Sequence, residues 1–167
     1  IPLFGINLGT LGYLAEIEQH NIYPALDRLM SDRFTIERRM MLSGEILRNG
    51  RKIASDVALN DIVISREGAL RVVRFNNYVN DTFLNTYKAD GIIISTPTGS
   101  TGYSLSAGGP IISPNASMLL MTPLAPHTLN TRSIVFSPED VITVELGEGR
   151  DGSVEQGMAS FDGDSSV

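Results

Sequence analysis

The stretch Gly91-Ile-Ile-Ile-Ser-Thr-Pro-Thr-Gly-Ser-Thr-Gly-Tyr-Ser-Leu-Ser-Ala-Gly-Gly-Pro110 joins a short apolar run to a loop rich in hydroxyl side chains and glycine. A continuous apolar run of this length, bounded by glycine, predicts a strand that is buried on both faces. Glycines let the backbone approach a ligand closely, and Ser and Thr hydroxyls with free amide groups can bind sugars or phosphates. The alternative is a solvated loop, but Tyr103 and Leu105 interrupt the polar run as packing residues do. We therefore predict a ligand cradle at the end of a buried strand.

The pattern from residue 34 onward is typical of strands. Short runs of apolar and β-branched residues alternate with turn residues, and Asn49-Gly50 and Asn80-Asp81 are typical of two-residue hairpin turns. We predict one short helix at 104–106 and strands over 35–42, 45–47, 52–59, 61–64, 71–75, 78–79, 82–87, 91–94, 118–121, 133–136 and 141–146. Such a series predicts an all-β or β-dominated domain over residues 34–167. Residues 161–167 show no recognisable terminal element.

The N-terminal part has a different pattern. Residues 1–6 predict the tail of a buried strand and residues 7–12 a turn with two close glycines, a succession common in α/β domains. Apolar side chains on one face, with Pro24 in the first turn, predict a helix that ends near residues 31–33. The expected parts are the tail of an N-terminal α/β domain (1–14), a connecting helix (15–33) and the β-rich domain (34–167).

Composition argues against several classes of function. The 167 residues carry a net charge of -6 without a basic cluster, so nucleic acid is not an expected partner. With no cysteine and two histidines, neither thiol chemistry nor a thiolate or multi-histidine metal site is expected. No apolar stretch is long enough for a membrane span and the N-terminus lacks the pattern of a secretory leader, so we expect a soluble, cytoplasmic protein without a membrane partner. The first and last residues suggest a piece of a longer polypeptide.

Polar residues beside apolar strands are the candidates for chemistry, because burial makes them costly unless they are used. Asn60 and Asp61 could meet a purine edge and two vicinal ribose hydroxyls, or could cap a turn. Asp90 precedes the apolar run and could hold a ligand amide or a backbone turn. Arg71 and Lys88 could meet phosphate, or could be solvated strand residues.

Several segments together resemble the NAD kinase family. They are Asn60-Asp-Ile-Val-Ile64, the stretch from Lys88 to Pro110, Pro123-Leu-Ala-Pro-His-Thr-Leu129 and the opening Gly5-Ile-Asn-Leu-Gly-Thr-Leu-Gly-Tyr-Leu14. The resemblance implies transfer of a phosphoryl group from ATP or polyphosphate to the 2′-hydroxyl of the adenosine ribose of NAD, giving NADP, with a divalent cation such as Mg. It also implies the α+β class: a β-dominated, antiparallel, sandwich-like C-terminal NAD kinase domain after the end of an N-terminal α/β domain.

The resemblance implies which residues bind NAD. Asn60 and Asp61 match an Asn-Glu pair that holds the adenine and ribose. Asp61 has the same carboxylate acceptor as the family's Glu, on a side chain that is shorter by one methylene group. The loop that encloses the adenosine is matched by Thr101, Gly102, Tyr103, Ser104, Leu105 and Ser106.

Other matches lie farther along the chain. Lys88 and Asp90 match polar ligand contacts, with Asp90 at the nicotinamide end. Ala125 matches a backbone or apolar contact, and Arg71 matches a basic contact often shared between subunits. Phe161-Asp-Gly-Asp164 resembles a later Asp-Gly turn of the family.

The family's Gly-Gly-Asp-Gly motif, whose Asp is the expected general base, does not occur in this sequence. We expect it upstream of Ile1, so no catalytic residue and no metal ligand is assigned within the chain. The resemblance implies the NAD-binding portion of an NAD kinase, inactive alone, in a homodimer or homotetramer that covers its edge strands. The alternatives are a non-catalytic nucleotide-binding or oligomerisation module of the same fold and a related lipid or sugar kinase.

Overall fold

The computed structural model describes residues 2–8, 17–68, 73–128, 131–148, 152 and 155–166. The chain forms two compact units, Ile1–Arg38 and Arg39–Val167, and each is considered by itself. In the first unit two short parallel strands pair, and a 3-10 turn leads into a helix. These elements are β1 (Ile6–Asn7), β2 (Ile17–Glu18), η1 (Gln19–Asn21) and α1 (Ile22–Met30). The predicted helix is confirmed, and no helix in the described ranges is long and apolar enough to cross a membrane.

The predicted N-terminal strand is shorter than expected. Residues 2–5, expected to belong to a buried strand, lie outside β1 and are exposed, with Leu3 at 87%. An apolar run becomes a buried strand only when another layer covers it, and the described residues of this unit provide no such layer. Most of the predicted glycine turn, residues 9–12, lies outside the described part of the chain.

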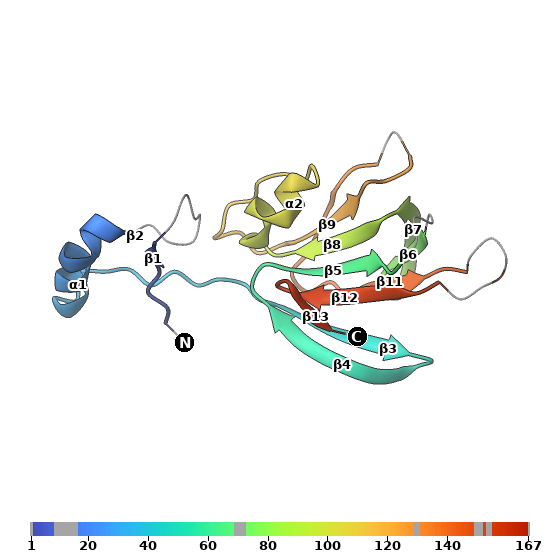
Figure 1. Cartoon of the computed structure of the whole chain (residues 1–167), viewed down its shortest axis with the longest axis horizontal. Helices are drawn as coiled ribbons and strands as arrows, with labels where there is room; N and C mark the ends of the chain where they lie inside the picture. Colours follow the sequence, from blue (N-terminus) through green and yellow to red (C-terminus); the bar gives the residue numbers. More distant parts are fainter. Residues whose placement is uncertain are drawn as a thin grey trace. The chain divides into compact units, whose positions relative to one another are not determined.

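The second unit is built from antiparallel sheets (Figure 1). A six-stranded sheet has the order β10-β9-β8-β5-β12-β13, a three-stranded sheet has the order β11-β6-β7, and β3 and β4 form a hairpin. Two helical segments, η2 (Gly99–Thr101) and α2 (Tyr103–Ser106), follow β8. The strands are β3 (Leu42–Arg48), β4 (Arg51–Ala58), β5 (Asp61–Arg66), β6 (Val73–Val79), β7 (Thr82–Ala89), β8 (Gly91–Ser95), β9 (Leu119–Leu124), β10 (Ile134–Phe136), β11 (Ile142–Leu146), β12 (Gly157–Phe161) and β13 (Asp164–Ser166). The predicted β-dominated, antiparallel fold is confirmed.

Two of the hairpin turns form where the sequence predicts them. Asn49 (φ 53°) and Gly50 (φ 73°) connect β3 to β4, and Asn80 (φ 48°) and Asp81 (φ 62°) connect β6 to β7. Two successive residues with positive φ form a type I′ turn, whose twist matches that of the flanking strands. Gly, Asn and Asp tolerate this left-handed backbone better than other residues, which is why these dipeptides are reliable signals.

The main core lies between the six-stranded and the three-stranded sheets. Buried side chains of β6 and β7 pack there against those of β8 and β9, namely Val73, Phe75, Tyr87, Ala89, Ile92, Ile94 and Met121. A second cluster joins β4, β5 and β12 through Ala58, Ile62 and Phe161. The β3–β4 hairpin approaches this cluster closely at Gly44: a Cβ atom at that position would lie 2.6 Å from Cδ1 of Ile62.

Strand β8 occupies the centre of the six-stranded sheet. It pairs with β5 along one edge and with β9 along the other, and each of its residues is buried. Ile92 and Ile94 belong to the main core, and α2 also contacts the strand. The prediction of a strand buried on both faces is therefore confirmed. The loop that follows β8 remains buried over residues 96–100.

Two strand predictions need correction. Residues 35–41 form no strand, and Ile36 is 68% exposed, because alternation gives a strand only where a neighbouring strand supplies hydrogen bonds. In the opposite direction, the C-terminal residues form the β12–β13 hairpin, for which the sequence indicated no element. β12 contains Gly, Ala and Ser, which are weak strand formers, and its pairing with β5 supplies the hydrogen bonds.

The core generates a stability prediction. We expect Phe75→Ala to lower the free energy of unfolding by about 3–5 kcal/mol, because it leaves a cavity where the ring is fully buried. Phe34→Ala is the matched control, since that ring is 49% exposed and should cost less than about 1 kcal/mol. Urea denaturation measures both values, and equal costs would contradict the position of the core.

Candidate functional site

Asn60 and Asp61 lie at the bend between β4 and β5, beside the loop that leaves β8. Thr96 holds this bend: its Oγ1 donates to the carbonyl of Leu59 (2.6 Å) and its N–H donates to the carbonyl of Asn60 (2.9 Å). A Cβ on Gly99 would lie 2.1 Å from the same Asn60 oxygen, so only glycine permits this approach of two backbones. The structure thus brings the predicted pair directly against the predicted cradle.

The carboxyl group of Asp61 is poorly solvated. The residue is 7% exposed, and its side chain accepts no hydrogen bond from the described part of the chain. Burial, and to a smaller extent the negative charge of Asp162, raises the pKa of Asp61 from 3.8 to about 6. At neutral pH the group is therefore mostly ionised and still lacks a donor. Such a carboxylate is suited to accept hydrogen bonds from ligand hydroxyls.

The hydroxyl groups of the loop after β8 divide into internal and accessible ones. Ser100 Oγ accepts the N–H of Ile112 (3.0 Å), and Ser104 Oγ is bonded to Thr122 Oγ1 (3.0 Å). The hydrogen bonds of these buried hydroxyl groups hold the loop in its conformation. Among the predicted contacts, Gly102, Tyr103, Leu105 and Ser106 are exposed, Thr101 is half-buried and Ser104 is buried. Ser104 Oγ is engaged within the protein, and Thr101 Oγ1 donates to the carbonyl of Thr98 (3.1 Å), which leaves the Thr101 oxygen free only as an acceptor. The exposed residues of the loop remain accessible to a ligand.

Lys88, Asp90 and Ala125 form a second group at the opposite end of β8. The N–H of Asp90 donates to the carbonyl of Leu124 (2.9 Å), and its carboxylate accepts from Nε of Arg66 (3.0 Å). Lys88 and Ala125 are exposed, and Ala125 has a left-handed backbone (φ 43°). This group combines a cation, a partly neutralised anion and an irregular backbone.

The structure therefore places the predicted residues in two groups, one at each end of β8. Asp61 pairs with Ser95 at one end of β8, whereas Asp90 precedes Gly91 at the other. Five residues of extended chain span about 17 Å, so the two groups lie too far apart to meet at one small chemical group. The remaining predicted contact, Arg71, lies outside the described residues.

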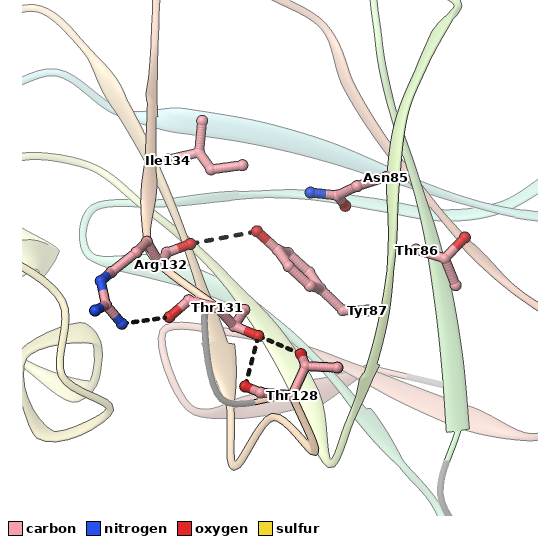
Figure 2. A pocket seen from close by; sticks show the side chains of 7 residues that line it. All are labelled: Asn85, Thr86, Tyr87, Thr128, Thr131, Arg132 and Ile134. Atoms are coloured by element: carbon pink, nitrogen blue, oxygen red, sulfur yellow. Dashed lines mark hydrogen bonds between the residues drawn. The ribbon is translucent and has the colours of Figure 1, made fainter.

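An open hollow of about 400 Å³ is lined by residues of β7, of β10 and of the loop that precedes β10 (Figure 2). Tyr87 Oη donates to the carbonyl of Arg132 (3.3 Å), and Thr131 Oγ1 donates to the carbonyl of Thr128 (3.0 Å). The N–H of His127 joins this loop to β7 through the carbonyl of Lys88 (2.8 Å). The lining residues are Asn85, Thr86, Tyr87, Thr128, Thr131, Arg132 and Ile134. Sequence reasoning missed this hollow, because β7, β10 and a loop form it together.

The described side chains do not provide a dedicated metal site. Within that part of the chain, no three His, Asp or Glu residues gather closely enough to hold a metal ion. The described residues therefore do not fit a cation held by the protein alone.

Comparison with known proteins identifies the family. Residues 59–167 match the family described as ATP-NAD kinase C-terminal domain. The chain belongs to this family. The chain is 49% identical to an NAD kinase of Lachnospira eligens over 99% of its length, and 51% identical to one of Agathobacter rectalis over 100% of it. It spans 59% and 58% of the length of these two relatives.

Solved structures have the same fold. A yeast NADH kinase complexed with NADH superimposes with a TM-score of 0.85 at 29% identity, covering 97% of this chain and 46% of that protein. An NAD kinase from Archaeoglobus fulgidus in complex with ATP gives a TM-score of 0.82 at 26% identity, covering 99% of this chain and 61% of that protein. The family that the sequence motifs indicated is confirmed, and nothing in these likenesses favours the lipid or sugar kinase alternative.

The raised pKa of Asp61 generates a pH prediction for this NAD kinase domain. The folded state binds the Asp61 proton more tightly than the unfolded state does. The free energy of unfolding therefore falls as pH rises from about 4 through about 6 and Asp61 loses this proton. We expect Asp61→Asn to unfold with a free energy on the order of 2 kcal/mol higher than wild type at about pH 8, with a smaller difference at about pH 5. Urea denaturation at both pH values measures it, and a gap that widened toward acid pH would contradict the assignment.

Proposed function

We propose that this chain is the NAD-binding portion of an NAD kinase, which transfers a phosphoryl group from ATP or polyphosphate to the 2′-hydroxyl of the adenosine ribose of NAD and yields NADP. The family match over residues 59–167 is the observation that carries this proposal. Relatives named NAD kinase align with nearly the whole chain and support it. The neighbours solved with NADH and with ATP support a nucleotide substrate and a nucleotide donor.

The geometry around Asn60 and Asp61 suits the acceptor nucleotide. An Asn amide can both donate to and accept from a purine edge. The ionised carboxylate of Asp61, which accepts no hydrogen bond from the described residues, can accept from two vicinal ribose hydroxyls. In this arrangement Asp61 orients the ribose and is not the proton acceptor of the reaction. Positioning of the reacting groups supplies much of the catalysis in phosphoryl transfer.

The two groups of residues take different parts of NAD. We assign the adenosine to Thr101, Gly102, Tyr103, Ser104, Leu105 and Ser106, with the exposed ring of Tyr103 as an apolar surface and Ser104 contributing through the fold of the loop. We assign the nicotinamide end to Lys88, Asp90 and Ala125, which lie at the other end of β8. Arg71 remains a proposed basic contact.

The phosphoryl donor is ATP or polyphosphate. The oxygen of the ribose hydroxyl bonds to phosphorus, the bond to the donor's leaving group breaks, and the hydroxyl proton passes to a general base, which we expect in a Gly-Gly-Asp-Gly segment outside this sequence. A divalent cation such as Mg is commonly held through substrate phosphates, and no residue of this chain is assigned to it. We place the enzyme in the cytoplasm as a soluble protein.

The first test measures the activity of the full-length protein. We expect NADP to form from NAD and ATP, and we expect this chain alone to bind NAD without forming NADP. NADP is measured with a coupled NADP-specific dehydrogenase, and NAD binding by isothermal titration. Full-length protein that binds NAD without making NADP would favour a non-catalytic module, and absence of NAD binding would refute the proposal.

A second test examines the proposed ribose contact. We expect Asp61→Ala to weaken NAD binding by the full-length protein by about ten- to a hundredfold, the effect of losing hydrogen bonds to a charged group. Asp56→Ala is the control, because Asp56 is an exposed residue of β4 whose carboxylate, among the described residues, accepts just the neighbouring N–H of Val57 (2.8 Å). Equal NAD affinities for the two variants would remove Asp61 from the site.

We also propose a homodimer or homotetramer formed through the β-rich unit. Its open sheets end in the edge strands β7, β10, β11 and β13, and it carries exposed apolar side chains such as Phe83 and Val141 at 56% and 63%. Covering such edges and side chains is a general reason for β-rich units to associate. We expect light scattering at micromolar concentration to give a mass of two or four chains. A monomeric mass would contradict this proposal.

A further inference from the structure

One carboxylate from the C-terminal hairpin holds the bend that carries Asn60 and Asp61. Asp162 Oδ2 accepts the N–H of Leu59 (2.6 Å), and its Oδ1 accepts the N–H groups of Asn60 (2.8 Å) and Asp61 (3.0 Å). The N–H of Asp162 donates in return to the carbonyl of Asp61 (3.0 Å). Four hydrogen bonds therefore join residues that are about a hundred positions apart in the chain.

The backbone of this bend is fully satisfied by two residues. The three N–H groups of residues 59–61 donate to Asp162, the carbonyls of Leu59 and Asn60 accept from Thr96, and the carbonyl of Asp61 accepts from Asp162. Every backbone donor and acceptor of the bend has a partner within the protein. Only the side chains of Asn60 and Asp61 are left to bind a ligand.

The turn between β12 and β13 directs the carboxylate toward this bend. Asp162 has a left-handed backbone (φ 49°) and is followed by Gly163 (φ 91°). Asp adopts this backbone more readily than most residues, and glycine adopts it freely. Three consecutive N–H groups that converge on an anion form a charge-assisted set of hydrogen bonds, stronger than bonds between neutral partners.

We propose that Asp162 is a positioning residue for NAD binding: it fixes the backbone of residues 59–61 so that the side chains of Asn60 and Asp61 are held ready for the nucleoside. This inference rests on the proposed function, because it takes those two side chains as the NAD contacts. Asp162 acts through them and does not itself touch the ligand.

Asp162 also acts on Asp61 electrostatically, which supplies a measurement that needs no ligand. Strand β5 lies between β8 and β12: the neutral Ser95 faces Asp61 from β8, and Asp162 follows the last residue of β12. The charge of Asp162 adds to burial in raising the pKa of Asp61 to about 6. Removing that charge should lower the pKa of Asp61, but not to 3.8, because burial is the larger cause.

The test compares Asp162→Asn with Asp140→Asn in the full-length protein. Asn keeps the size of Asp and tolerates a positive φ, but one of its terminal atoms donates, so at least one N–H of the bend loses its acceptor. Asp140 is a matched control: its carboxylate accepts the N–H of Ser137 (2.9 Å) and the side-chain amide of Asn80 (2.8 Å) in a turn on the other sheet. Both variants lose one charge and disturb one turn.

We expect Asp162→Asn to weaken NAD binding by about tenfold or more, as for the loss of hydrogen bonds to a charged group. Carboxyl-carbon NMR should show the titration midpoint of Asp61 falling below about 6, and amide exchange at Asn60 and Asp61 should accelerate. Asp140→Asn should leave all three quantities unchanged. If Asp162 contributed only to overall stability, its substitution would not change the titration midpoint of the Asp61 carboxyl group.

A second variant decides the matter if Asp162→Asn fails to fold. Asp162→Glu keeps the charge but changes the reach, so the Asp61 midpoint should stay raised while amide exchange accelerates and NAD binding weakens. Wild-type NAD affinity and amide exchange in either folded variant would overturn the inference. Wild-type protein that does not bind NAD would overturn the proposed function itself, so the two failures are distinguishable.

Discussion

Strand β8 is hydrogen-bonded along both edges and buried on both faces, and the remainder of the β-rich unit is arranged around it. Its apolar side chains complete the main core with β6, β7 and β9, so the two sheets cannot separate without exposing them. A strand in this position is rigid, and rigid elements place functional side chains more accurately than loops do. Both groups of candidate residues lie at its ends.

The cost of burying polar groups explains the architecture at the end of β8. The loop that follows the strand is buried over residues 96–100, so its hydroxyl and backbone groups require partners. Thr96 and Ser100 meet this requirement by bonding to the bend at residues 59–61 and to Ile112. The same hydrogen bonds that stabilise the buried loop thus bring it against Asn60 and Asp61. In this region the hydrogen bonds that stabilise the fold are therefore also the ones that form the site.

Local patterns predicted the elements whose structure depends on neighbours in sequence. Asn49-Gly50 and Asn80-Asp81 form the expected turns because their backbone preference is a property of the residues themselves. Local patterns failed for residues 35–41 and for β12. Residues 35–41 have strand-like alternation but no partner strand, and they form no strand. β12 lacks a strand-like composition but pairs with β5. Pairing between distant segments decides such cases, and a local pattern does not contain it.

The sequence by itself determined the family, the β-dominated fold and the buried strand with its hydroxyl-rich loop, because these depend on motifs and on the periodicity of apolar residues. Tertiary structure alone decided that Ser104 turns its hydroxyl inward to Thr122 and that the predicted contacts divide between the two ends of β8. It alone also brought Asp162 to the bend at Asn60 and Asp61. The contacts of Asp162 join residues far apart in the chain, and the pairing of β5 with β12 is what brings them within hydrogen-bonding distance.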